Sequence, residues 1–265
     1  MSNPTGSFIW YELMTTDPQG ATAFYGDVVG WKVIGGGPQP SGVDYRQIVR
    51  SDGAAAGGML ALSEQMQAGG ARPCWLGYIH VADVDSTVEG IVADGGKVLM
   101  PKTSIGVGSF GLVTDPQGVP FYVMSPIPPA HDPDATSDVF SPTKAQHVRW
   151  NELMTTDADA ALAFYQRHFG WGQEGAMDMG SLGSYRFLQC GGVTIGALMQ
   201  KTPQAPFPFW TYYIGVDDIG RAAAAIEAGG GKIIHGPHEI PGGEFSLSGI
   251  DPQGAPFGLV GPKLS

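Results

Sequence analysis

The pattern of apolar and polar positions predicts that the chain begins with a strand and a helix. Residues 9–14 read IWYELM, an apolar run that contains one glutamate and is typical of a strand. Asp17 and Pro18 fit a helix N-cap and first helical position, and Gly30 is a stop signal. Between them, apolar side chains recur at helical spacing, at Ala21, Phe24, Tyr25 and Val28.

Three short strands are expected after this helix, so the first unit of the pattern is βαβββ. They lie between glycine-rich turns, at residues 31–34, 45–49 and 58–62. A second βαβββ unit follows. Its first strand is expected at 76–81, its helix at 84–93 and its last three strands at 97–100, 109–114 and 121–125. The tetrapeptide DPQG occurs at residues 17–20, 115–118 and 251–254. At residues 17–20 it opens the first helix, and elsewhere it is a turn signal before a strand, so we interpret it as a chain reversal without a chemical role.

The whole pattern occurs twice along the chain. Residues 10–17 (WYELMTTD) match residues 150–157 (WNELMTTD), and the pairs FY at 24–25 and GW at 30–31 return 140 positions later. Further along, the spacing shrinks to about 135 positions, where Trp75 matches Trp210. The chain is therefore a tandem duplication, with predicted domains at 1–127 and 145–265. The proline-rich residues 128–144 are predicted to be an extended linker.

Composition and charge narrow the function classes. The net charge of −11 argues against nucleic acid as a partner, because phosphates require a basic surface. No apolar run reaches the length of about 18 residues that a membrane span needs. Two cysteines are too few for a disulfide framework, and the N-terminus shows no secretory signal. We therefore expect a soluble cytoplasmic protein, and the 41 glycines indicate many tight turns.

Several repeated motifs resemble those of the vicinal-oxygen-chelate superfamily, which includes glyoxalase I, bleomycin and fosfomycin resistance proteins and extradiol dioxygenases. The motifs are TTD after the first strand, FY and GW around the helix, VADVD and GVDDI after the fifth strand, and DPQG-x-PF before the eighth. The resemblance implies an α+β fold of four βαβββ modules, in two cup-shaped eight-stranded mixed sheets with helices outside. The chain is most similar to the tandem glyoxalase-like proteins of bacteria. Single-domain relatives usually dimerise, so both a monomer and a homodimer are expected states.

The resemblance also implies positions for a metal, which that superfamily usually holds on the first, fifth and eighth strands of a cup. Aligned by the motifs, these positions are Trp10, Leu76 and Tyr122 in the first copy and Trp150, Thr211 and Gly258 in the second. None is a histidine, aspartate, glutamate or glutamine, and indole, leucine and glycine side chains offer a cation no lone pair. We therefore expect no metal cofactor at this site.

Glu12 and Glu152 are the strongest candidates for catalysis. Because strand side chains alternate, a strand whose Trp10 faces the cup also turns Glu12 and Met14 to that face. A carboxyl in an apolar cup can be tuned for proton transfer or can bind a ligand. The alternative is structural: Glu12 and Glu152 pair with Arg46 and Arg186, which are duplicated with them.

His80 is a further candidate. It is expected on the same strand face as Tyr78, where it can bind a polar ligand or act as a base beside Glu12. A hydrogen-bonded histidine at a strand end is the alternative, and the counterpart in the second copy is Gly215. The candidate substrate-binding residues are mostly aromatic, namely Trp10, Tyr45, Tyr78, Tyr122, Trp150, Tyr185, Thr211 and Tyr213.

These observations leave three hypotheses for the function. The first is a metal-independent lyase or isomerase that acts on a small carbonyl-bearing or aromatic molecule, with Glu12 or Glu152 moving a proton. The second is a binding protein of the resistance type, which holds a small hydrophobic molecule without turnover. The third is a scaffold without a working site. The missing metal ligands argue against ordinary glyoxalase or dioxygenase chemistry and do not separate the first two hypotheses.

Overall fold

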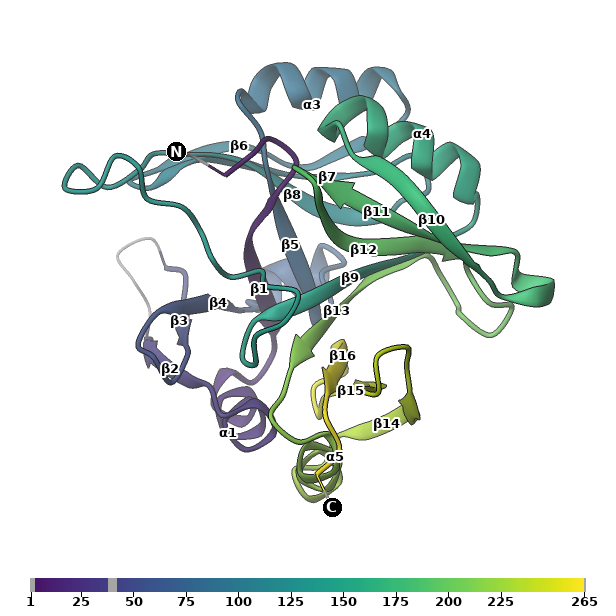
Figure 1. Ribbon diagram of the computed structural model, residues 1–265. Helices are drawn as coiled ribbons and strands as arrows, with labels where there is room; N and C mark the ends of the chain where they lie inside the picture. Colours follow the sequence, from purple (N-terminus) through teal and green to yellow (C-terminus); the bar gives the residue numbers. More distant parts are fainter. Residues whose placement is uncertain (1–2, 38–41, 265) are drawn as a thin grey trace. The chain divides into compact units, whose positions relative to one another are not determined.

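The computed structural model describes residues 3–37 and 42–264. Four βαβββ modules follow one another in this part of the chain (Figure 1). The first consists of β1 (Phe8–Thr15), α1 (Pro18–Val29), β2 (Lys32–Gly35), β3 (Tyr45–Val49) and β4 (Ala55–Ala61). The second consists of β5 (Cys74–His80), α3 (Val84–Ala93), β6 (Lys97–Ile105), β7 (Gly108–Thr114) and β8 (Pro120–Pro126). The predicted repeat of four modules is confirmed.

The second copy repeats this order. Its first module consists of β9 (Val148–Thr155), α4 (Ala158–Phe169), β10 (Gly172–Asp178), β11 (Ser184–Cys190) and β12 (Val193–Gln200). Its second consists of β13 (Phe209–Gly215), α5 (Ile219–Ala228), β14 (Lys232–Glu239), β15 (Phe245–Ile250) and β16 (Pro256–Gly261). Two short elements were not predicted, the helix α2 (Glu64–Ala68) and the 3₁₀ turn η1 (Gly180–Leu182).

Each copy forms a mixed eight-stranded sheet, so the α+β class is confirmed. The strand orders are β2-β3-β4-β1-β5-β8-β7-β6 and β10-β11-β12-β9-β13-β16-β15-β14. Within a module, the first and fourth strands run parallel, as β1 and β4 do with Glu12 opposite Gly58. The neighbouring hairpin strands run antiparallel. The two sheets lie within the predicted domains 1–127 and 145–265.

Local sequence signals explain where the helices begin and end. The Asp17 side chain accepts hydrogen bonds from the backbone N–H groups of Gln19 and Gly20, which have no partner inside the first turn. Gly30 ends α1 in the left-handed region, at φ 85°. The N-cap and the stop signal were both predicted. None of the helices within residues 3–37 and 42–264 is long and apolar enough to cross a membrane.

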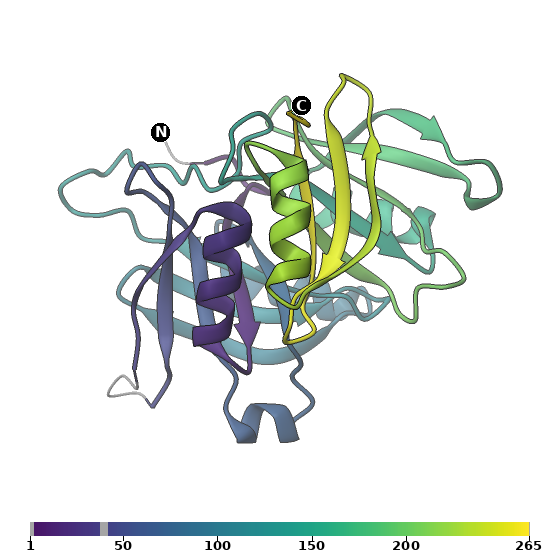
Figure 2. The same cartoon turned by 90° about the horizontal axis from the view of Figure 1, so that it is seen from below.

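The chain forms two compact units, and their boundaries differ from those of the two sheets. Unit 1 consists of Met1–Ile9, Leu76–Asp138 and Trp150–Trp210, and unit 2 consists of Trp10–Trp75, Val139–Arg149 and Thr211–Ser265. Each unit therefore contains one module from each copy. In unit 1, α3 lies beside α4 (Figure 1), and in unit 2, α1 lies beside α5 (Figure 2).

The core of unit 1 is built around Tyr165 of the FY motif. Its ring lies almost parallel to that of Trp171, 8° apart in plane with centroids 5.0 Å apart, and also contacts Phe121. The Trp171 indole N–H donates to the Gly6 carbonyl at 2.8 Å. The tryptophan of the GW motif in the second copy thus fixes the segment that precedes β1, the first strand of the first copy.

Unit 2 repeats this arrangement with the copies exchanged. Tyr25 packs against Trp31 and Phe257. The Trp31 indole N–H donates at 3.0 Å to the carbonyl of Gln146, in the segment that precedes β9. The FY and GW motifs therefore join modules of different copies into one core. This explains why they occur in both copies.

The predicted linker is ordered where it approaches β9. In unit 1, Asn3 and Ser137 exchange two hydrogen bonds, at 2.9 and 2.7 Å. In unit 2, Val139 is buried, and Phe140 forms an isolated β-bridge with Val148. Most of residues 128–144 are exposed, and the packed part is the short stretch around Val139 and Phe140.

Candidate functional site

A chain of hydrogen bonds links three side chains on one face of the second copy. The Trp150 indole Nε1–H donates to the Tyr185 hydroxyl at 2.7 Å. The same hydroxyl donates to Glu152 Oε2, also at 2.7 Å. Glu152 is 8% exposed, whereas Trp150 and Tyr185 are half-buried. We call these three residues, all in unit 1, the copy-two open chain.

The first copy contains the same chain in unit 2. The Trp10 indole N–H donates to the Tyr45 hydroxyl at 2.8 Å, and this hydroxyl is hydrogen-bonded to Glu12, which is 2% exposed. Burial raises the pKa of Tyr45 above its usual value, and the Glu12 carboxylate raises it further. Tyr45 is therefore a neutral donor at physiological pH. We call Trp10, Tyr45 and Glu12 the copy-one open chain.

Both open chains agree with the predicted strand alternation. Trp10 and Glu12 are two residues apart on β1 and both reach Tyr45, so they share one face of the strand. Trp150 and Glu152 do the same on β9 through Tyr185. The sequence therefore placed both glutamates correctly beside tryptophan.

The predicted pairing of the glutamates with arginines is wrong. Arg46 forms an ion pair with Asp44 at 2.9 Å, and Arg186 forms one with Asp159 at 2.6 Å. The guanidinium of Arg46 lowers the pKa of the Asp44 carboxyl. The physical reason is alternation, since Arg46 follows Tyr45 directly and points to the opposite face of β3. Tyrosines, and not these arginines, hold the glutamates.

Cys74, at the start of β5, lies close enough to the copy-one open chain to sense its charge. Burial raises the pKa of the Cys74 thiol to about 12, and the Glu12 carboxylate contributes to the increase. The thiol therefore stays protonated at neutral pH and is a poor nucleophile. No sequence motif pointed to this neighbour of Glu12.

The other predicted binding residues lie elsewhere on the modules. In unit 1, Tyr78 and Tyr122 face each other across β5 and β8, with stacked rings whose centroids are 4.1 Å apart. Both are nearly fully buried. In unit 2, Thr211 is buried, and Tyr213 is half-buried with its ring packed against Gly258. Tyr78 and Tyr122 are therefore mainly core residues.

His80 lies at the end of β5, beside the N-terminal segment. Its Nδ1 is 3.2 Å from the Pro4 carbonyl oxygen, and its backbone N–H donates to the Ser7 carbonyl at 2.8 Å. Gly215 makes the same backbone contacts in the second copy, with the carbonyl of His147 as its acceptor. A Cβ at Gly215 would lie 2.5 Å from Arg149 Cδ and 2.6 Å from the backbone carbonyl oxygen of Lys144, so there is no room for a histidine side chain there. His80 thus has the geometry of a hydrogen-bonded residue at a strand end.

The residues at the superfamily's metal positions do not fit a divalent cation. The indole nitrogen of Trp10 is a hydrogen-bond donor, and Tyr122 presents a stacked ring. In the second copy, the Tyr213 ring covers Gly258. Across residues 3–37 and 42–264, no group of three or more histidine, cysteine, aspartate or glutamate side chains is arranged to hold a metal ion. Only Tyr122 in the first copy and Thr211 in the second carry a side-chain oxygen at these positions, so neither copy supplies the three good donors that such a site requires.

Two further hydrogen-bonded chains, buried inside the units, were missed by the sequence analysis. In unit 1, the Trp210 indole donates to the Tyr165 hydroxyl at 3.2 Å, and that hydroxyl donates to Asp115 Oδ2 at 3.1 Å. In unit 2, the corresponding residues are Trp75, Tyr25 and Asp251, at 2.9 and 3.1 Å. We call these the sealed chains, because their aromatic rings and carboxylates are all buried.

Two of the three DPQG motifs, at residues 115–118 and 251–254, supply the acids of the sealed chains. The predicted chain reversal is confirmed, since Asp115 Oδ1 accepts the Val119 N–H at 2.8 Å. However, the second carboxylate oxygen accepts the Tyr165 hydroxyl, so the aspartate also ties two modules together. Burial raises the pKa of Asp115 and Asp251, while their hydrogen bonds lower it. The repetition of both FY and DPQG in the two copies was the only sequence signal that could have suggested this pairing, and it does not say which residues pair.

Unit 1 also contains a cavity of about 360 Å³ outside the open chain. Its lining includes Arg186, Asp159 and Gln200. Arg186 points to the opposite side of β11 from Tyr185, so this cavity does not include the open chain. The lining contains the ion pair of Arg186 and Asp159 and no aromatic side chain, unlike the surroundings of the copy-two open chain.

Comparison with known proteins identifies the family. The profile of the Glyoxalase/Bleomycin resistance protein/Dioxygenase superfamily matches residues 7–123 and 144–257. The chain belongs to this superfamily. It is 32% identical over 255 residues to the Mycobacterium tuberculosis protein named "Putative glyoxylase CFP32", covering 96% of this chain and 94% of that protein. It is also 27% identical over 124 residues to the anthracycline biosynthesis protein DnrV of Streptomyces peucetius, covering 42% and 45% of the two chains.

Solved structures show the same superfamily fold. The Mn(II)-bound glyoxalase from Novosphingobium aromaticivorans superposes with a TM-score of 0.65 at 15% identity, over 98% of this chain and 83% of that one. The 2,3-dioxygenase LapB from Pseudomonas sp. KL28 superposes with a TM-score of 0.62 at 12% identity, over 98% and 94%. At these identities the likeness concerns the fold alone.

Proposed function

We propose that this superfamily member binds a small carbonyl-bearing or aromatic molecule at its open chains and that Glu12 or Glu152 transfers a proton on it. The reaction would be of the lyase or isomerase type. The observation that carries the proposal is the duplicated arrangement of a buried carboxylate, a tyrosine hydroxyl and a half-buried indole. The 32% identity to a protein named as a glyoxylase supports a carbonyl substrate.

Each residue of the open chain has a distinct role in this proposal. The Trp150 N–H and the Glu152 carboxylate fix the direction of the Tyr185 hydroxyl, which accepts from the first and donates to the second. The carboxylate is thereby held in one orientation. It then removes a proton from a carbon beside the substrate carbonyl and returns it to a neighbouring carbon. Tyr185 and Trp150 are positioning residues whose half-buried rings also offer the substrate an apolar surface.

The proposal includes no metal, because the side chains at the superfamily's metal positions do not fit one. We expect chelator treatment to leave ligand binding and turnover unchanged. Elemental analysis of the purified protein provides the direct measurement. One tightly bound Mn, Fe, Ni or Zn per copy would contradict this part of the proposal.

The decisive experiment compares Glu12→Gln, Glu152→Gln and the double variant with the native protein. Turnover is followed by NMR as deuterium incorporation beside the carbonyl, in a panel of small aliphatic and aromatic carbonyl compounds. Removing a general base is expected to lower the rate by about 10²–10⁴-fold, while affinity changes little. Glu89→Gln, on the exposed surface of α3, is the matched control. Native rates in the double variant would rule out catalysis by these carboxylates.

The second candidate function is binding without turnover, as in resistance proteins. The half-buried aromatic side chains beside each acid favour this alternative, because they suit sequestration as well as catalysis. Under this hypothesis the native protein binds members of the panel and exchanges no deuterium. The glutamine variants then change only the affinity for ligands that donate a hydrogen bond.

A further inference from the structure

The two polar aromatic rings of the copy-two open chain form a nearly flat surface. The ring planes of Trp150 and Tyr185 are 10° apart, with centroids 6.4 Å apart. An indole N–H lies in the plane of its ring, so the hydroxyl oxygen that it meets at 2.7 Å lies near that plane. The same oxygen lies in the plane of the phenol ring. Two parallel planes that share an atom nearly coincide, so the rings lie side by side and not face to face.

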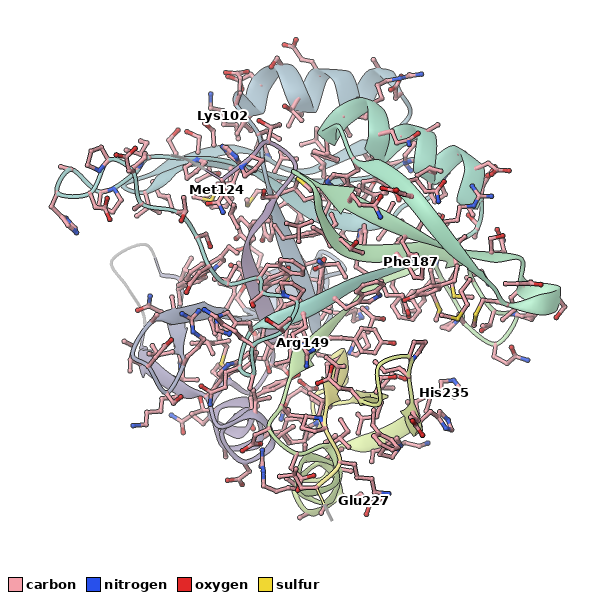
Figure 3. All side chains as sticks on the ribbon, in the orientation of Figure 1. Lys102, Met124, Arg149, Phe187, Glu227 and His235 are labelled. Carbon is pink, nitrogen blue, oxygen red and sulfur yellow. The ribbon has the colours of Figure 1, made fainter. Side chains whose placement is uncertain are left out.

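Phe187 stands upright against this surface. Its ring is inclined by 78° to Trp150 and by 83° to Tyr185, with centroids 6.0 Å away in both cases. Figure 3 marks its position on the strands of this module. On its other side the ring packs close to Gly175, where an added Cβ would lie 3.2 Å from it. Trp150 and Tyr185 thus form a floor, and Phe187 forms a wall beside it.

Met177 extends the floor at its outer edge. It pairs with Tyr185 across β10 and β11, so the two side chains lie on the same face of the sheet. Its side chain is 39% exposed. A thioether beside aromatic rings is polarisable and adaptable, and such surfaces suit flat apolar ligands.

The first copy lacks the wall at the corresponding position. In the second copy, Phe187 pairs with Ala197. In the first copy, Gly58 takes the place of Ala197 and pairs with Gln47, which is therefore the counterpart of Phe187. Gln47 is exposed. The replacement of Ala197 by Gly58 also matters, because the Tyr45 hydroxyl occupies the space that a Cβ would fill. The two open chains share their hydrogen bonds and differ in the shape of the aromatic surface around them.

We infer that the copy-two open chain selects a flat, fused-ring aromatic molecule that carries an O–H or N–H donor, and that Phe187 is a specificity-determining residue. The fused rings lie on the floor with one edge against Phe187, and the donor reaches the Glu152 carboxylate. This inference rests on the proposed binding role of the open chain and does not require proton transfer.

Isothermal titration with three probes tests the inference. The probes are 2-naphthol, which has two fused rings and a donor, phenol, which has one ring, and naphthalene, which has no donor. The native protein is expected to bind 2-naphthol most tightly. Phe187→Gln, which introduces the first-copy residue, should weaken 2-naphthol binding about three- to tenfold, the value of a lost aromatic pair. Phe187→Tyr keeps the ring and should retain most of the affinity.

Two further variants complete the design. Phe207→Gln makes the same substitution at a phenylalanine of unit 1 that is 60% exposed, and it should leave the affinity unchanged. Glu152→Gln should reduce the preference for 2-naphthol over naphthalene. Equal binding of phenol and 2-naphthol, equal affinity of Phe187→Gln and Phe207→Gln, or no binding of 2-naphthol up to its solubility would each overturn the inference. The first two results leave the proposed function intact, whereas deuterium exchange in the double glutamine variant tests that function separately.

Discussion

Unit 1 contains two Trp–Tyr–carboxylate chains with the same chemical groups and different surroundings. In the sealed chain, Tyr165 is inaccessible and Asp115 also holds the backbone of its own turn. In the open chain, Tyr185 and Trp150 remain half-buried while Glu152 is covered. Unit 2 contains the same two kinds of chain, around Tyr25 and Tyr45. Accessibility, and not residue type, therefore separates the structural chains from the candidate functional ones.

The difference shows why residue type alone is a poor guide to function here. A tyrosine between an indole and a carboxylate fills the core in one place and presents a flat polar-edged surface in another. In the sealed chain, hydrogen bonds join modules of different copies. In the open chain, they orient an acid within one module. The experiments below test this division.

The largest expected effect is on stability, and it should fall on the sealed chain. Tyr165→Ala removes a fully buried ring and is expected to lower the free energy of unfolding by about 3–5 kcal/mol. Tyr185→Ala removes a half-buried ring and should cost about 1–2 kcal/mol. Urea denaturation of both variants measures the two values. Equal losses would show that the open chain is as structural as the sealed one.

A smaller effect should distinguish the two open chains. In Gly58→Ala, the new methyl group overlaps the Tyr45 hydroxyl, so the Tyr45 ring is expected to move and to lose its contacts with Trp10 and Glu12. The free energy of unfolding should fall by about 1–3 kcal/mol. A crystal structure of the variant shows the ring position. An undisturbed Tyr45–Glu12 contact would show that the glycine is not required.

The smallest effect is a dependence on pH that arises from the sealed carboxylates. Burial raises the pKa of Asp115 and Asp251 in the folded state above the ordinary value of 3.8. The folded protein therefore binds these protons more tightly, and their contribution to stability is lost as the pH rises through the raised pKa values. Asp115→Asn cannot titrate. Its stability should therefore fall less than that of the native protein between about pH 4 and about pH 7.

Measuring the free energy of unfolding across that pH range, in the native protein and in Asp115→Asn, isolates the contribution of the Asp115 carboxyl to the pH dependence. Carboxyls with lowered pKa values, such as Asp94 beside Arg167, contribute with the opposite sign in both proteins and cancel in the comparison. If the two proteins lose stability in parallel, the sealed aspartate does not titrate as the structure indicates.

Much of the fold could be predicted from the sequence because the signals were local. Helix α1 begins after Asp17 and ends before Gly30, as expected. The alternation of side chains along β1 placed Trp10 and Glu12 on one face, and the alternation along β9 did the same for Trp150 and Glu152. Repetition of the FY, GW and DPQG motifs showed that the chain contains two copies, and the pattern of apolar and polar positions divided each copy into two modules. These predictions needed only nearest-neighbour chemistry and periodicity.

The failures concern partners that are distant in sequence. Arg46 was a plausible partner for Glu12 because both are duplicated, yet β3 turns it to the other face, where Asp44 binds it. DPQG was interpreted as a turn alone because nothing near Asp115 in sequence reveals Tyr165. The absence of a side chain at Gly215 follows from Arg149 and from the backbone of Lys144, which lie 66 and 71 positions earlier in the chain, so no local pattern could explain it.

The exchange of hydrogen bonds between copies has a consequence for how the gene can be divided. A fragment with residues 1–127 would retain Tyr25 and Trp31 without Asp251 and the Gln146 carbonyl that they bind. Such a half can satisfy those buried donors only by associating with a second polypeptide that supplies the missing acceptors. Each repeat therefore supplies hydrogen-bond acceptors to buried aromatic side chains of the other, so a cut between the repeats separates donors from their acceptors.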